Sequence, residues 1–276
     1  MNQSNGLYVA GESFFHRMDA AVKLILLLTW TVVTFLFMDL RVFAIMLAGG
    51  VTMLLLARVP FRKMALLFWA LMVFTVINSI FILLITPRFG TTLTGSDTPI
   101  IPLGYDTINA ETLFYVLTLS LKYLTLLPIT LLFIFTTHPS RFAASLNKLG
   151  VPYKLAYAVS IAFRYIPDLT KEFRTILNAL QMRGLGISRG DGTLLQRARN
   201  VTQAVVPLLQ SSLQRIESVS DAMDLRGFGT RPQRTWYMGT VMKGSDKLIA
   251  LLCVVLLATG VGLKQSLLQG FWYPFG

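Results

Sequence analysis

Five long apolar runs limit what this chain can fold into. They cover about 19–38, 41–57, 64–86, 112–137 and 247–263. A helix needs about 20 apolar residues to cross the hydrocarbon core of a bilayer, whereas the strands of an outer-membrane barrel are alternating segments of about ten. Of the 276 residues, 54% are hydrophobic and 14% are charged, against about 25% charged in soluble domains. The sequence therefore predicts an all-α, polytopic helical membrane protein with about five transmembrane helices.

The charges between these runs predict how the chain crosses the membrane. The 58–63 connection carries a net charge of +3, the 87–111 connection −2 and the 138–247 stretch +9. Cytoplasmic connections are the ones rich in Lys and Arg, so we expect a cytoplasmic N-terminus and an external C-terminus. The same rule accounts for the formal net charge of +12 and disfavours nucleic acid as a partner. The external 87–111 loop is rich in Gly, Pro and Thr, which is typical of a loop with a short hairpin.

Three regions follow from this pattern: a membrane domain of four spans at 1–137, a cytoplasmic region at 138–246, and a final transmembrane helix with its tail at 247–276. No short basic segment precedes the first run, so we expect a retained span and not a signal peptide. The sequence of the cytoplasmic region predicts a short helix at 140–149 and a helix at 153–166 that ends before Pro167. After Pro167 it predicts an amphipathic helix to about 184. A polar linker at 186–200 and a second amphipathic helix at 202–226 complete it.

An eight-residue pattern, A-x-x-[ML]-R-G-[LF]-G, occurs at the predicted end of each amphipathic helix. The first copy starts at Ala179 and the second at Ala222, and their arginines, Arg183 and Arg226, are 43 positions apart. Residues four apart share one helix face, and the guanidinium of arginine is a rigid fork suited to a carboxylate. A glycine follows each arginine and is a natural helix end. One copy alone is most simply an ordinary helix stop, but two copies favour a pair of equivalent docking points.

The neighbours of the two arginines support docking over a purely structural role. A cation near a helix C-terminus stabilises the helix by about 0.3–1 kcal/mol, which is the structural alternative. No acidic residue lies three or four positions from Arg183 or Arg226, so the usual salt bridge within one helix is excluded. We therefore expect both arginines to meet a partner outside their own helices.

These features together resemble the transmembrane T component of energy-coupling factor (ECF) transporters, the CbiQ/EcfT-type family. The resemblance rests on Met182-Arg183-Gly184, Leu225-Arg226-Gly227, Leu149-Gly150-Val151-Pro152, Arg164-Tyr165-Ile166-Pro167 and Glu172. It covers most of the chain and is strongest from 139 to 229. The family motif is commonly Ala-Arg-Gly, and here Met182 and Leu225 replace its alanine.

The resemblance implies a coupling subunit in a bacterial or archaeal cell (inner) membrane. It implies two cytoplasmic coupling helices that dock on two ABC-type ATPase subunits, and a separate membrane-embedded S component that binds a vitamin or metal ion. The chain itself is then not an enzyme and needs no cofactor, in agreement with the absence of a G-x-x-x-x-G-K-[ST] loop. The ATPase-docking residues that the resemblance implies are Ala179, Met182, Arg183, Gly184, Ala222, Leu225, Arg226 and Gly227.

Two other functions make different demands on the sequence than a coupling subunit does. The permease of an ordinary ABC importer would have its own substrate path and one coupling helix per chain, and Lys122 is the clear charged candidate within a span. An intramembrane enzyme would need paired acids or a Ser/His set within the spans, and we find no catalytic or metal-binding set there. The methionines near 38–72 suit either an adaptable surface for different S components or ordinary lipid-facing packing.

Overall fold

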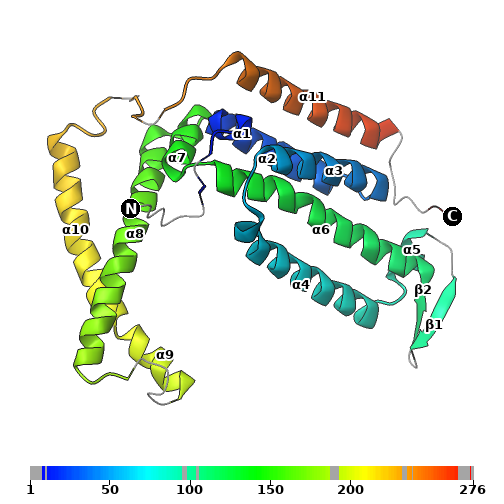
Figure 1. The fold of residues 1–276 in the computed structure, drawn as a ribbon, viewed down its shortest axis with the longest axis horizontal. Helices are drawn as coiled ribbons and strands as arrows, with labels where there is room; N and C mark the ends of the chain where they lie inside the picture. Colours follow the sequence, from blue (N-terminus) through cyan, green and yellow to red (C-terminus); the bar gives the residue numbers. More distant parts are fainter. Residues whose placement is uncertain are drawn as a thin grey trace. The chain divides into compact units, whose positions relative to one another are not determined.

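A 27-residue helix, α6 (Ala110–Thr136), is the centre of the membrane-spanning part of the protein. The computed structural model describes residues 8–9, 11–94, 98–103, 106–186, 193–231, 235–237, 239–266 and 274. Its contacts divide the chain into a membrane unit, Met1–His138 with Thr240–Gly276, and a helical unit, Pro139–Gly239. Each unit is described by itself (Figure 1).

The membrane unit contains the apolar helices that the sequence predicts. Helices α4 (Phe61–Ile85), α6 and α11 (Gly244–Ser266) each contain a stretch long and apolar enough to cross a bilayer. Helices α2 (Ala20–Leu36) and α3 (Leu40–Leu56) are also apolar but have 17 residues each, or about 26 Å. The predicted all-α, multi-span class is confirmed. That α2 and α3 also cross the bilayer stays a prediction.

The connections of the membrane unit are short elements. Helix α1 (Phe14–Arg17) precedes α2, and α5 (Phe89–Thr94) follows α4. Strands β1 (Pro99–Leu103) and β2 (Asp106–Asn109) pair antiparallel within the 87–111 connection, which confirms the predicted hairpin.

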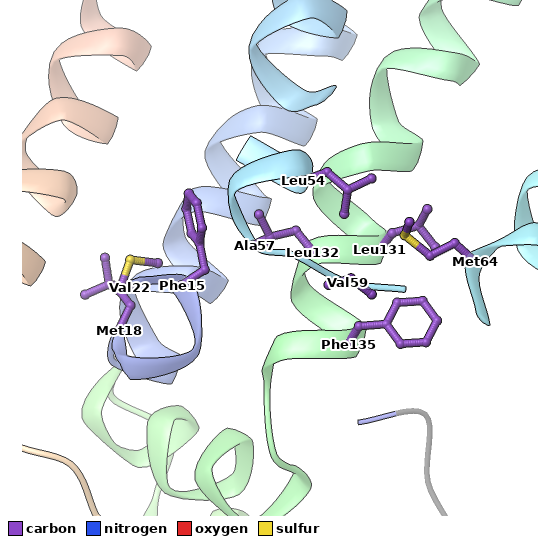
Figure 2. Close-up of a cluster of buried hydrophobic side chains, with 10 residues drawn as sticks. All are labelled: Phe15, Met18, Val22, Leu54, Ala57, Val59, Met64, Leu131, Leu132 and Phe135. Atoms are coloured by element: carbon purple, nitrogen blue, oxygen red, sulfur yellow. The ribbon is translucent and has the colours of Figure 1, made fainter. Parts of the chain in front are cut away.

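Helix α6 packs against α2, α3, α4 and α5, while α11 lies along α2 (Figure 1). Gly50 of α3 allows close approach to α6, because a Cβ atom there would lie 3.2 Å from Cβ of Pro128. On the neighbouring helix, the indole Nε1 of Trp30 donates to the Thr125 carbonyl oxygen at 3.2 Å. Figure 2 shows the apolar cluster around the α3–α4 turn, made of Phe15, Met18, Val22, Leu54, Ala57, Val59, Met64, Leu131, Leu132 and Phe135.

Buried polar groups join the starts of α2 and α11. The Asp19 side chain caps α2 by accepting from the Ala21 amide at 2.8 Å, and it also accepts from the Thr240 hydroxyl at 2.9 Å. The carboxylate of Asp246 lies 3.4 Å from the Asp19 amide nitrogen. A further bond joins α2 to the end of α6, where Lys23 donates to the Thr136 carbonyl oxygen at 2.8 Å. These bonds satisfy groups that would otherwise be costly to bury.

His16 is a buried side chain in α1 with both ring nitrogens satisfied. Its Nε2 donates to the Val9 carbonyl oxygen at 3.0 Å, and its Nδ1 forms a hydrogen bond with the Ser13 hydroxyl at 2.6 Å. A carbonyl oxygen only accepts, so Nε2 carries a proton. Burial lowers the pKa of His16 below its ordinary value of 6.5.

The helical unit contains α7 (Pro139–Lys148), α8 (Tyr153–Met182), α9 (Leu194–Thr202) and α10 (Val205–Leu225). The predicted helix at 140–149 is confirmed as α7. The predicted break at Pro167 is wrong, because α8 continues through this proline. Helix α9 was not predicted and occupies part of the predicted linker, of which residues 187–192 lie outside the described residues.

Candidate docking site

Helices α8 and α10 end in the same backbone geometry. At the end of α8, the Leu185 amide donates to the Leu180 carbonyl oxygen at 3.1 Å and the Gly184 amide to that of Gln181 at 3.0 Å. These two bonds define a Schellman motif, in which a left-handed residue stops the helix. Gly184 has φ +86°, a conformation that costs other residues about 1–2 kcal/mol.

The end of α10 repeats each of these bonds. The Phe228 amide donates to the Met223 carbonyl oxygen at 2.9 Å, and the Gly227 amide donates to that of Asp224 at 2.9 Å. Gly227 has φ +63°. The two copies of the sequence pattern therefore fold into equivalent helix ends, with Arg183 and Arg226 as the C-cap residues.

The apolar residue before each arginine is exposed. Met182 is 85% exposed and Leu225 is 90% exposed. Arg183 and Arg226 are exposed as well, and so is Ala222, whereas Ala179 is half-buried. Each end thus presents an apolar side chain next to a guanidinium. The two arginines differ in one respect, because Arg226 also takes part in an interaction within this chain.

Aromatic side chains fix the second end against the start of α8. The Phe228 ring lies 4.8 Å from that of Tyr157 and 5.6 Å from that of Tyr153, between centroids. Tyr157 and Arg183 lie on one helix, and 26 residues at 1.5 Å per residue place them about 39 Å apart along its path. The two ends are therefore at opposite ends of α8 (Figure 1).

An ion pair joins α8 and α10 between these ends. Arg215 of α10 donates from Nη2 to Oε2 of Glu172 at 2.7 Å. The Ser211 hydroxyl donates to the other oxygen of Glu172, and the Arg215 guanidinium lies 5.7 Å from the centroid of Tyr165. The side chains of Glu172 and Arg215 are 23% and 36% exposed, so water screens this pair less than a surface pair.

A groove of about 290 Å³ lies between the first half of α8 and the last half of α10. Arg164 and Arg226 both line it, together with Tyr157, Ala222 and Phe228. Two guanidinium groups at one groove favour an acidic group from a partner.

The predicted apolar faces of the two helices differ in burial. On α8, Phe173 and Leu180 are half-buried, whereas Leu209, Leu213 and Ile216 of α10 are 58–62% exposed. The α10 face is therefore not covered by α8. Its exposure leaves an apolar surface on the same helix that carries the second arginine.

Sequence reasoning missed the groups that join the two helices. Ser211 and Arg215 are polar residues without a recognisable motif, and their pairing with Glu172 depends on how the helices cross. Helix α9, in contrast, has a readable start, because Thr193 and Gln196 form a capping box. Among the described residues, no three His, Cys, Asp or Glu side chains gather as a metal site would require.

Comparisons with known proteins cover both the membrane helices and this site. The family model described as Cobalt transport protein (CbiQ) matches residues 11–237. The "Energy-coupling factor transporter transmembrane protein EcfT" of Brevibacillus brevis is 29% identical over 266 residues, which are 92% of this chain and 96% of that protein. The protein of the same name from Leuconostoc gelidum subsp. gasicomitatum is 31% identical over 244 residues, 84% of this chain and 86% of that protein. The chain therefore belongs to the CbiQ family, that of the transmembrane T components of energy-coupling factor transporters.

Proposed function

We propose that this protein couples ATP hydrolysis by two ABC-type ATPase subunits to a membrane-embedded S component that takes up a vitamin or metal ion. The chain itself binds and hydrolyses no nucleotide in this proposal. The observation that carries it is the pair of equivalent helix ends, each with an exposed apolar residue, an arginine and a capping glycine. Two equivalent ends suit a partner with two equivalent grooves.

Each part of the helix end has a role in docking. The arginine forms charge-assisted bonds to acidic groups in the ATPase groove. Met182 and Leu225 bury their apolar side chains beside it, which adds affinity because they are exposed in this chain. The glycines end the helices, so the arginines point from a tip into a groove. The docking residues are Ala179, Met182, Arg183 and Gly184 on α8, and Ala222, Leu225, Arg226 and Gly227 on α10.

The crossing of α8 and α10 carries the movement from the ATPases. Closure of the ATPase pair moves the two helix ends toward each other. The Glu172–Arg215 bond joins the helices where they cross, so movement of one end favours movement of the other. The exposed α10 face with Leu209, Leu213 and Ile216 then acts on the S component. The +9 charge of 138–247 supports a cytoplasmic location for this machinery and for the N-terminus.

The test removes each arginine and then both. We expect Arg183→Gln and Arg226→Gln each to weaken uptake severalfold. The double variant should lose uptake and should lose ATPase subunits on copurification, because both anchors are gone. Mass spectrometry of the copurified proteins identifies the ATPases and the S component and separates this function from that of an ordinary ABC permease, which binds no S component.

The matched control is the double variant Arg174→Gln/Arg199→Gln. Both residues are exposed arginines of the same unit outside the two motifs, so this variant should transport normally. A double Arg183/Arg226 variant that copurifies with both ATPases and transports at the wild-type rate would refute the docking role.

A further inference from the structure

An apolar groove of about 560 Å³ lies between α3, α4 and α6 of the membrane unit. Leu47 and Leu55 of α3 and Phe61 and Met72 of α4 mark its ends, and Leu124–Leu131 of α6 forms its floor. Every lining residue is apolar. Such a groove between apolar helices suits an apolar occupant, because an unfilled apolar hollow loses dispersion contacts.

The length of the groove matches one leaflet of the bilayer. On α4 the lining runs from Phe61 to Met72, which is about 16 Å at 1.5 Å per residue. Half of a hydrocarbon core is about 15 Å. The groove begins at the α3–α4 turn, at one end of these helices, and its length suits a single acyl chain.

The turn at the mouth of the groove exposes two arginines. Ala57 and Val59 are 1% and 5% exposed and belong to the cluster in Figure 2, so Arg58 between them is directed outward. Arg58 and Arg62 are exposed, and neither guanidinium has a hydrogen-bond or ion-pair partner among the described residues.

The backbone at Arg58 is also unusual. Arg58 has φ +53°, the only positive φ at a described residue other than glycine. Glycine adopts this left-handed conformation without steric cost. A non-glycine residue in this conformation is strained, and such strain is found most often at functional sites. The strain at Arg58 therefore suggests that its side chain has a function.

We propose that the groove holds one acyl chain of an anionic phospholipid whose phosphate is bound by Arg58 and Arg62. Guanidinium groups bind phosphate oxygens through paired hydrogen bonds, and basic residues beside a membrane span select anionic lipids. The apolar groove alone accepts any acyl chain, so the preference for a negative headgroup comes from the two arginines. This inference requires only that the chain spans a membrane, and it is independent of the ATPase docking.

The experiment is native mass spectrometry of the full chain in detergent with added phosphatidylglycerol or phosphatidylcholine of identical acyl chains. Wild-type protein should retain phosphatidylglycerol at least fivefold more than phosphatidylcholine. Arg58→Gln/Arg62→Gln should reduce this preference to about equal retention. Arg58→Gly should lower it as well, although glycine suits the backbone, so its loss reports on the side chain and not on misfolding.

A second pair of variants tests the groove itself. Ala65 and Ala70 are exposed alanines of α4, but only Ala65 lines the groove. Ala65→Phe should fill the groove and lower retention of both lipids severalfold, whereas Ala70→Phe should leave retention unchanged. Equal retention of the two lipids by wild-type protein, or equal behaviour of the two phenylalanine variants, would overturn the proposal. If Ala65→Phe instead abolishes copurification of a membrane partner and leaves phosphatidylglycerol retention intact, the groove holds a protein helix and the proposal is wrong.

Discussion

Breaking the Glu172–Arg215 pair should loosen the crossing of α8 and α10 by a measurable amount. A hydrogen bond to a charged group contributes about 1.5–3 kcal/mol when buried, and an exposed ion pair contributes about 0.2–1 kcal/mol. With a 2.7 Å bond and side chains 23% and 36% exposed, this pair lies between the two cases. We expect a coupling free energy of about 1 kcal/mol, or about a fivefold change in the local opening constant.

A double-mutant cycle of Glu172→Gln and Arg215→Gln isolates this coupling. Hydrogen exchange of α8 and α10 peptides, measured on the full chain in detergent, reports local opening without requiring the whole protein to unfold in one step. The pair Asp168–Lys171 is the matched control, because its atoms are 3.9 Å apart and its side chains are 53% and 67% exposed. Its coupling should stay below about 0.3 kcal/mol.

The outcome of the cycle shows whether the Glu172–Arg215 pair couples α8 to α10 or contributes no more than a surface ion pair. A coupling equal to that of the control pair would refute the reasoning, since the partly buried pair would then contribute no more than a surface contact. If coupling is present, the proposed function predicts that uptake by the Glu172→Gln variant falls while the proposed ATPase partners remain bound. That combination is expected of a part that transmits movement and does not dock.

Two further predictions concern the membrane unit. Gly90→Ala should destabilise the fold by about 3 kcal/mol, because the added Cβ would lie 2.3 Å from the backbone carbonyl carbon of Glu111, whereas Gly262→Ala meets nothing within 4 Å and should be tolerated. The purified yield and the thermal unfolding midpoint test this pair, and equal midpoints would contradict it. Because the pKa of His16 is lowered in the fold, the unfolded chain binds its proton more readily, so stability should fall as pH drops below about 6.5. His16→Gln should remove this part of the acid sensitivity, as midpoints at pH 7.5 and 5.5 would show.

The amino-acid sequence by itself determined the class of this protein and the ends of α8 and α10. Apolar runs of about 20 residues indicate helices, which satisfy their own backbone hydrogen bonds within a bilayer, and charge between the runs predicts orientation. The ends of α8 and α10 were predictable because a Schellman motif forms from residues that are neighbours in the sequence. Its left-handed position favours glycine, and Gly184 and Gly227 have φ +86° and +63°. The hairpin at 99–109 and the helix α7 also follow from local turn signals.

Only the tertiary structure decided that α8 continues through Pro167 and how α8 meets α10. A proline within a helix costs about 3 kcal/mol, and local reasoning therefore ends a helix before Pro167. The fold keeps α8 continuous because α7 packs on its first half, where Phe142 lies 6.0 Å from Phe163, and Arg215 of α10 binds its second half at Glu172. The groove beside Arg58 likewise depends on the packing of α6 against α3 and α4, from which α6 is distant in sequence. Contacts across such distances leave no periodic signal in the chain, so helix ends could be predicted from the sequence, and the crossing and the groove could not.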